Sequence, residues 1–336
     1  MINKKLLYTF IFILIIFIFN GCTPKFNTDL LIISSPDNKV INYSKYNSNK
    51  KIQEKIYSTN KTCYPTAVLS YDANTLYFTK SDKYGLAQLF ERNLNTKKEK
   101  QLTFQKDNKI INVDFLKINY SKNIIYLRIV QENHRNFNLA IYNINSNELK
   151  ILDENEYDLS DQFFDFNNIS KSILIFQNSI KEEFNLMDKA NKTKNFNISP
   201  NYDILLKDES GEKQNTYGSI ENNIVDVSIS PDNKSALILT GQIVDLSKHE
   251  FKKSILLKDL NNIDKNEIIL NNLESYNDIT KICFSKDGKG FYFIATESKD
   301  KSQNYNLYYY NLKNQESSQI LKFDNEDIFD CIPIYK

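Results

Sequence analysis

Four cysteines are the residues of this sequence with the clearest capacity for covalent chemistry: Cys22, Cys63, Cys283 and Cys331. No two of them have the C-x-x-C spacing, which argues against a zinc site. Apart from Cys22, each lies in a strand-like apolar run. Two interpretations stay open for these three residues: one disulfide in an oxidising compartment, or buried free thiols.

The residues before Cys22 predict attachment to lipid. Two lysines precede an almost unbroken apolar run from Leu6 to Phe19. This run of about fourteen residues is shorter than the roughly twenty that span a bilayer, and it suits the apolar region of a secretory signal. The following Phe19-Asn20-Gly21-Cys22 resembles a bacterial lipobox, although Phe19 and Asn20 depart from its usual residues.

The lipobox resemblance implies a signal peptide at 1–21, an acylated Cys22 as the first mature residue and a lipidated tether at 22–29. The alternative is an uncleaved N-terminal anchor helix, which also takes the rest of the chain out of the cytoplasm. The mature chain keeps about 315 residues, and its formal net charge changes from +1 to −1. Basic and acidic residues total 43 and 42 and are interspersed, so we expect no nucleic acid among its partners.

Enzyme motifs are scarce. The two histidines, His134 and His249, fall in polar stretches, and no second histidine follows His249 at the metalloprotease spacing. No G-x-S-x-G elbow occurs. The segment Gly288-Lys289-Gly290 lies in a predicted hairpin, not at the start of a helix, which argues against a phosphate-binding loop.

Acidic residues gather near the C-terminus, at Asp324, Glu326, Asp327 and Asp330. Their spacing matches no known calcium loop, so we interpret them as a solvated lead into the last strand. The sequence therefore predicts a non-enzymatic protein with no cofactor and no metal site.

A degenerate repeat sets the architecture. Each of its five copies has an apolar strand, a turn with Ser or Asp and a second apolar strand, and the turns stand roughly 50 to 60 residues apart. The copies occupy residues 67–78, 115–127, 163–176, 225–239 and 282–294. Each copy continues into a third strand, predicted at 88–94, 139–144, 184–188, 255–260 and 307–312, and then into a short fourth strand such as 100–103 or 319–321.

Four short strands per unit are typical of a propeller blade. The chain ends are expected to complete a sixth blade, with a first strand at 328–335 and the other strands at 30–33, 40–49 and from Ile52. The prediction is therefore an all-β propeller at 30–336, with six four-stranded blades and ring closure between the C-terminal strand and the N-terminal strands. A seventh blade would need a unit too degenerate to recognise. We expect one insertion loop, at about 199–222.

The turns Ser-Pro-Asp-Asn-Lys at 230–234 and Ser-Lys-Asp-Gly-Lys at 285–289, with Gln-Leu-Thr at 101–103, resemble the repeat of TolB-type propellers. The resemblance covers nearly all of residues 28–336, but the chain has no Trp and has Gly at only one of these turns. With its lipobox and composition, the chain also looks like spirochaetal outer-membrane lipoproteins that associate with the β-barrel assembly machinery.

These resemblances imply a non-enzymatic scaffold that is lipid-anchored in the bacterial outer membrane and faces the periplasm. Its expected partner is another envelope protein, with the β-barrel assembly complex as the candidate. One alternative is a surface-exposed lipoprotein that binds a host macromolecule or glycan. Another is a propeller hydrolase or lyase with its site in the central channel.

Overall fold

The computed structural model describes residues 29–48, 50–60, 64–195, 198–245, 250–262, 268–269, 276–297, 304–323 and 325–335. The predicted signal peptide and Cys22 lie outside the described residues, as do Cys63, His249 and Asp324. Within the described ranges, no helix has the length and apolar character needed to cross a membrane.

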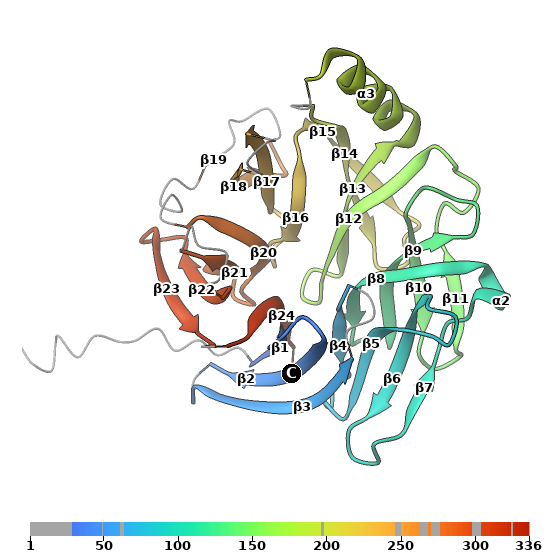
Figure 1. The fold of residues 1–336 in the computed structure, drawn as a ribbon, viewed down its shortest axis with the longest axis vertical. Helices are drawn as coiled ribbons and strands as arrows, with labels where there is room; N and C mark the ends of the chain where they lie inside the picture. Colours follow the sequence, from blue (N-terminus) through green and yellow to red (C-terminus); the bar gives the residue numbers. More distant parts are fainter. Residues whose placement is uncertain are drawn as a thin grey trace, which may run out of the picture.

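The described residues form six four-stranded antiparallel sheets around a central axis, which confirms the predicted all-β, six-bladed propeller (Figure 1). Blade 1 consists of β4 (Ala67–Leu69), β5 (Thr75–Ser81), β6 (Ala87–Asn93) and β7 (Glu99–Gln101). Blade 2 consists of β8 (Ile110–Asn119), β9 (Ile124–Gln131), β10 (Asn138–Asn143) and β11 (Glu148–Ile151). Blade 3 consists of β12 (Leu159–Asn167), β13 (Ser172–Ser179), β14 (Asn201–Asp208) and β15 (Gln214–Glu221). Blade 4 consists of β16 (Ile224–Ile229), β17 (Ser235–Asp245), β18 (Glu250–Asp259) and β19 (Ile268–Ile269). Blade 5 consists of β20 (Asp278–Phe284), β21 (Gly290–Thr296), β22 (Asn306–Asn311) and β23 (Glu316–Leu321). Blade 6 consists of β24 (Asp327–Ile334), β1 (Asp29–Ser35), β2 (Val40–Asn47) and β3 (Ile52–Asn60).

Ring closure occurs in blade 6, as the sequence predicts. The C-terminal strand β24 pairs with β1, from Asp29 opposite Ile334 to Ser35 opposite Asp327. Strands β2 and β3 complete the sheet. Closure leaves no open seam between the last and first blades, and open strand edges are what invite aggregation.

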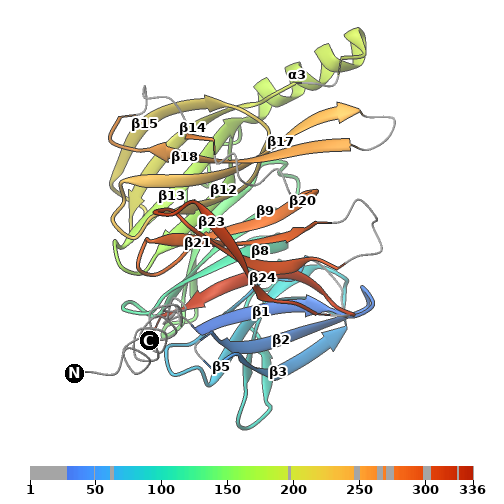
Figure 2. The ribbon, with the colours of Figure 1, turned by 90° about the vertical axis from the view of Figure 1, so that its left-hand side faces the viewer.

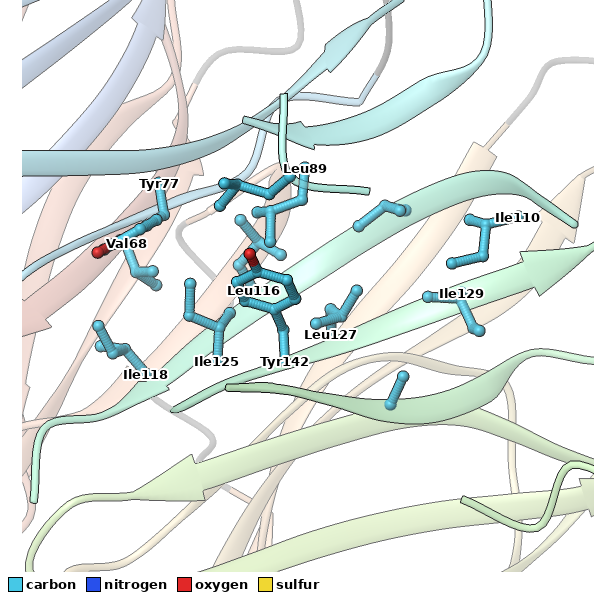
Figure 3. Close-up of a cluster of buried hydrophobic side chains, with 13 residues drawn as sticks. Val68, Tyr77, Leu89, Ile110, Leu116, Ile118, Ile125, Leu127, Ile129 and Tyr142 are labelled. Atoms are coloured by element: carbon cyan, nitrogen blue, oxygen red, sulfur yellow. The ribbon is translucent and has the colours of Figure 1, made fainter. Parts of the chain in front are cut away.

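The hydrophobic core lies between blades, because each strand alternates its side chains between the two faces of its sheet. In Figure 3, Val68, Tyr77 and Leu89 of blade 1 pack against a face of blade 2 that includes Ile125 and Leu127. All five are buried. The aliphatic and aromatic residues of the repeat therefore supply inter-blade packing.

The turn between the first and second strand has the same hydrogen-bond pattern in blades 1, 4 and 5. In blade 4, the Ser230 hydroxyl donates to Asp232 Oδ1 at 2.7 Å, and the same oxygen accepts from the Lys234 N–H at 3.1 Å. In blade 5, Ser285 donates to Asp287 at 2.7 Å. Asn233 has φ 59° and Gly288 has φ 66°, as the predicted tight turns require.

Blade 3 departs from the prediction. The expected third strand at 184–188 lies inside a helix, α3 (Ile180–Thr193), and the expected insertion loop at 199–222 forms β14 and β15. Strand β14 pairs with β13 along Ser172–Gln177. The excursion is thus the helix, and the blade resumes after it. A second helix, α2 (Gln105–Asn108), is one turn long and lies between blades 1 and 2.

A capping sequence explains α3. The Ser179 hydroxyl accepts from the Glu182 N–H at 3.1 Å, and two glutamates in the first turn favour the positive end of the helix dipole. Ser-x-x-Glu before a helix is a known start pattern, so the sequence did carry a signal for the helix. Phe184 and Met187 stand three residues apart on one helix face, a spacing that a strand does not have.

Candidate functional site

The central channel is open at one end. A cavity of about 770 Å³ lies where the inner strands β8, β16, β20 and β24 begin. We call this end the mouth. Its wall is largely apolar and includes Ile111, Val130, Phe137 and Phe329. Six acidic or basic side chains also line it: Asp114, Lys117, Arg128, Asp226, Lys281 and Asp330.

The channel is nearly filled at the other end, which we call the closed end. A cavity of about 30 Å³ remains there, lined by residues late in the inner strands, including Asn167 and Ile229, and by Tyr335. The ring of Tyr335 lies 6.5 Å from that of Tyr120, and Lys286 Nζ lies 5.1 Å from its centroid. Among the described residues, the channel is therefore wide at the mouth and nearly filled at the closed end.

Arg128 is held firmly at the mouth. Its Nε and Nη2 donate to the two Asp114 oxygens at 2.7 and 2.9 Å, and its Nη1 donates to the Gln162 carbonyl. The guanidinium lies 4.2 Å from the Phe115 ring centroid and 4.1 Å from that of Phe137. Bidentate pairing and two aromatic faces fix one orientation of this charge.

Phe115 reaches the channel through a backbone irregularity. The pairing of β8 with β9 shifts register between Asp114 and Lys117, and Phe115 has φ 50°. A bulky residue in the left-handed region costs about 1–3 kcal/mol and is found mostly at functional sites. The bulge places the Phe115 ring between Arg128 and Lys281, whose Nζ lies 4.4 Å from the ring centroid.

Ion pairs join the inner strands of different blades. Lys117 Nζ of β8 lies 2.7 Å from Asp165 Oδ1 of β12. Lys281 Nζ of β20 lies 3.3 Å from Asp226 Oδ1 of β16. Asp226 also accepts from the Ile282 N–H at 3.0 Å. These contacts join blade 2 to blade 3 and blade 4 to blade 5 across the channel wall.

The pKa values reflect burial beside opposite charge. Burial alone would lower the pKa of Lys117, but Asp165 outweighs it and raises the pKa well above its ordinary value. Burial likewise acts to lower the pKa of Lys281, but nearby carboxylates, mainly Asp226, outweigh burial and raise it. Burial raises the pKa of the Asp226 carboxyl, although Lys281 opposes the shift. Both lysines therefore stay charged at neutral pH.

Sequence reasoning placed some of these residues and missed others. The acidic cluster separates: Glu326 accepts from the Ser34 hydroxyl at 2.6 Å, Asp327 accepts from the Tyr305 N–H at 3.2 Å, and Asp330 lines the mouth. His134 contacts Tyr157, with ring centroids 4.9 Å apart and the two ring planes tilted by 51°. In the part of the chain that is described, no three His, Cys, Asp or Glu side chains group as a metal site.

The channel charges were missed, although each has a recognisable context. Lys117, Asp165, Asp226 and Lys281 are isolated charges inside apolar first-strand runs. A charge in such a run needs a partner when the strand is buried. The enzyme alternative required titratable side chains converging at the channel mouth, and the structure has such a cluster.

Comparisons with known proteins support the fold. No protein-family model matches the sequence. No curated protein matches it in sequence either. Among solved structures, TolB from Acinetobacter baumannii is similar, with 12% identity and a TM-score of 0.60 over 95% of this chain and 70% of that one. The TolB-type propeller expected from the turns is thus confirmed as a fold.

Two other solved structures share the architecture. Kuenenia stuttgartiensis hydrazine synthase matches with 11% identity and a TM-score of 0.61, over 92% of this chain and 47% of that one. An oligogalacturonate lyase from Vibrio parahaemolyticus matches with 13% identity and a TM-score of 0.51, over 87% and 73%. At such identities the likeness establishes the fold alone, because propellers serve many functions.

Proposed function

We propose that the protein is a non-enzymatic scaffold of the bacterial cell envelope, anchored by lipid at Cys22, that binds another envelope protein at the mouth of its channel. The observation that carries the proposal is the contrast between the mouth, with its cavity of about 770 Å³, and the closed end. A concave, mostly apolar surface with fixed charges is typical of recognition sites. The outer-membrane protein assembly complex is the partner that the resemblance implies.

The anchor and the mouth would lie on opposite faces. Asp29, the first described residue, pairs with Ile334 at the end of β24, so the chain enters the propeller at the closed end. A tether from Cys22 would therefore hold the closed end toward the bilayer. The mouth would then point away from the membrane, toward the water-soluble part of a partner.

The surface around the mouth supports docking. Helix α3 follows β13 at Ser179, which pairs with Leu159 at the start of β12, so α3 stands on the mouth face (Figure 2). Phe184 and Met187 of α3 are exposed by 44% and 49%. A cavity of about 160 Å³ beside them shares Phe137 with the mouth. Channel and helix thus offer one continuous surface with exposed apolar residues.

Affinity isolation of the full-length lipoprotein from detergent-solubilised membranes tests this proposal. The wild type is expected to recover an outer-membrane assembly protein, identified by mass spectrometry. Met187→Glu should lower that recovery at least about tenfold, because a desolvated charge in an interface costs more than 1.4 kcal/mol.

Ile169→Glu is the matched control. Ile169 is 54% exposed and lies between β12 and β13, at the closed end. Its substitution adds the same charge on the opposite face, and recovery should stay at the wild-type level. If the protein is recovered without any outer-membrane assembly protein, the result would count against the scaffold function. If Met187→Glu and Ile169→Glu lower recovery equally, the result would count against the mouth as the binding site.

Protease treatment of intact cells tests the location. A periplasmic scaffold should resist digestion until the outer membrane is permeabilised. Digestion of intact cells would contradict the periplasmic location and favour the surface-exposed alternative, a lipoprotein that binds a host macromolecule or glycan.

A second candidate is a lyase with its site at the mouth. Asp226 favours it, since a buried carboxyl with a raised pKa beside a cavity suits proton transfer. The lyase of similar fold suggests oligogalacturonate as the first substrate to try. Formation of an unsaturated product by the wild type, followed by ultraviolet absorbance and lost in Asp226→Asn, would support it. Absence of product would rule out oligogalacturonate lyase activity.

A further inference from the structure

Two buried thiols meet at the seam where the ring closes. Cys283 lies on β20 of blade 5 and Cys331 on β24 of blade 6. Their Sγ atoms are 3.7 Å apart, and the Cys283 thiol also approaches the Cys331 carbonyl oxygen at 3.4 Å. Both cysteines are free, with exposures of 6% and 2%. The sequence left open whether these cysteines form one disulfide or stay as buried free thiols. If a disulfide forms, this contact makes Cys283 and Cys331 the two partners.

We propose that Cys283 and Cys331 are a redox-active pair that a disulfide-bearing oxidant converts into a covalent bond between blades 5 and 6. The oxidant belongs to the class of thiol–disulfide oxidoreductases or low-molecular-weight disulfides. This bond goes beyond the scaffold function and does not depend on any partner.

The geometry permits the bond without a change of fold. A disulfide needs its sulfurs about 2.0 Å apart, so they must approach by roughly 1.7 Å from the present 3.7 Å. Rotation of the two side chains can supply that movement. The cysteines sit in one apolar cluster with Ile32, Tyr292 and Ile294. Well-packed strands on both sides hold the sulfurs in register.

The pair is reachable from the mouth, because both cysteines line its cavity. The hydrogen bond with Cys283, followed by burial, raises the pKa of the Cys331 thiol. Asp330 and Asp226 add to this effect. The Cys331 thiol is therefore protonated near neutral pH, and Cys283, the more exposed of the two at 6% against 2%, is the sulfur that meets the oxidant first.

The reaction balances as a two-electron exchange. The Cys283 thiol loses its proton and attacks one sulfur of the oxidant disulfide, which forms a mixed disulfide and releases one thiolate. The Cys331 thiol then loses its proton and attacks the Cys283 sulfur, which releases the second thiolate. The protein loses two hydrogens, and the oxidant is reduced to two thiols.

The bond would stabilise the seam of the ring, where the C-terminal strand β24 pairs with the N-terminal strand β1. Strand β24 joins its own sheet through β1 alone, whereas β20 belongs to the preceding blade. A link from β20 to β24 closes a loop of 48 residues and ties the C-terminal strand to blade 5. In the unfolded chain such a loop loses conformational freedom, which favours the folded state.

Peptide mapping of the intact lipoprotein in detergent tests the proposal. The protein is equilibrated with oxidised glutathione or with dithiothreitol, unfolded in N-ethylmaleimide and digested with trypsin. The sequence places Cys283 in the peptide 282–286, Cys331 in 323–336 and Cys63 in 62–80. We expect the oxidised sample to contain 282–286 linked to 323–336 with two hydrogens fewer, and the reduced sample to contain both peptides alkylated.

Thermal unfolding of the same samples gives a second readout. Oxidised wild type should unfold about 5 °C above reduced wild type. Cys63→Ser should keep this difference, and Cys331→Ser should lose it together with the linked peptide. The proposal is overturned if glutathione yields no linked 282–286 peptide, if Cys63 is the partner found, or if the linked protein unfolds at the reduced temperature.

Discussion

The mouth and the closed end are built from the same inner strands, yet they differ in what fills them. At the mouth the strands surround about 770 Å³, and at the closed end about 30 Å³ remains. Ser-x-Asp turns and Tyr335 occupy the closed end, whereas the mouth holds charges fixed on aromatic faces. Side chains therefore fill the closed end, whereas the mouth leaves the space that the proposed binding of a partner requires.

The largest effect should follow from removing a carboxylate at the closed end, Asp165, which pairs with Lys117, a residue that lines both cavities. Asp165 accepts from Lys117, from the Ser228 hydroxyl at 2.9 Å and from the Ile229 N–H at 2.9 Å. Asp165→Ala leaves the lysine buried without its partner, which should lower the free energy of unfolding by about 3–5 kcal/mol. Urea denaturation measures the loss, and Asp165→Asn, which keeps an acceptor, should lose less. A loss below about 1 kcal/mol for the alanine variant would contradict the role of this pair.

A smaller effect is expected at the mouth itself. Arg128→Met removes the partner of Asp114 but leaves that carboxylate beside a chamber large enough for water. The expected loss is about 2 kcal/mol, the cost of hydrogen bonds to a charged group. Denaturation under the conditions used for Asp165→Ala provides the comparison. If Arg128→Met destabilised the protein more than Asp165→Ala, the contrast between the two ends would be wrong.

Opening the closed end should cost less again. Tyr335→Ala removes a half-buried ring that contacts Tyr120 and Lys286. The loss of partial apolar burial should lower the free energy of unfolding by about 1–2 kcal/mol. Partner recovery in the affinity experiment should not change, because the mouth is untouched. A loss of recovery matching that of Met187→Glu would mean that recognition involves the closed end.

The smallest effect concerns the turns at the closed end. The Ser230 hydroxyl and the Lys234 N–H lower the pKa of Asp232, and Ser70 and Asn74 do the same for Asp72. A depressed carboxyl pKa stabilises the fold above the unfolded value of about 4, and that contribution disappears as the pH falls through the folded value.

Asp232→Ala should therefore lower the free energy of unfolding by about 0.5–1 kcal/mol at pH 7, with the difference from wild type vanishing as the pH falls through the lowered pKa of the folded protein. Urea titrations at several pH values measure it. Glu212→Ala, at an exposed pair with Lys150, is the control and should change little at any pH. A deficit that persists at low pH would assign the effect to packing.

The sequence predicted the parts of the molecule that repeat. Turn residues such as Asp232 and Gly288, and apolar strands of similar length, reveal a blade wherever they recur. Blade 3 was read wrongly because Phe184 and its neighbours resemble a third strand in composition, and the Ser179 cap outweighs that composition locally. The channel charges escaped because pairs such as Lys281 and Asp226 are 55 residues apart and meet only in the closed ring.

The seam of blade 6 has a consequence for how the chain is made. Ser34 and Glu326 are hydrogen-bonded at 2.6 Å but stand 292 residues apart. While the chain is being synthesised, β1 has an exposed edge until Asp327–Ile334 becomes available to cover it. Contacts of such high sequence separation form slowly. The early blades must therefore be kept from pairing with other chains, so a chaperone that shields strand edges would raise the yield of folded protein.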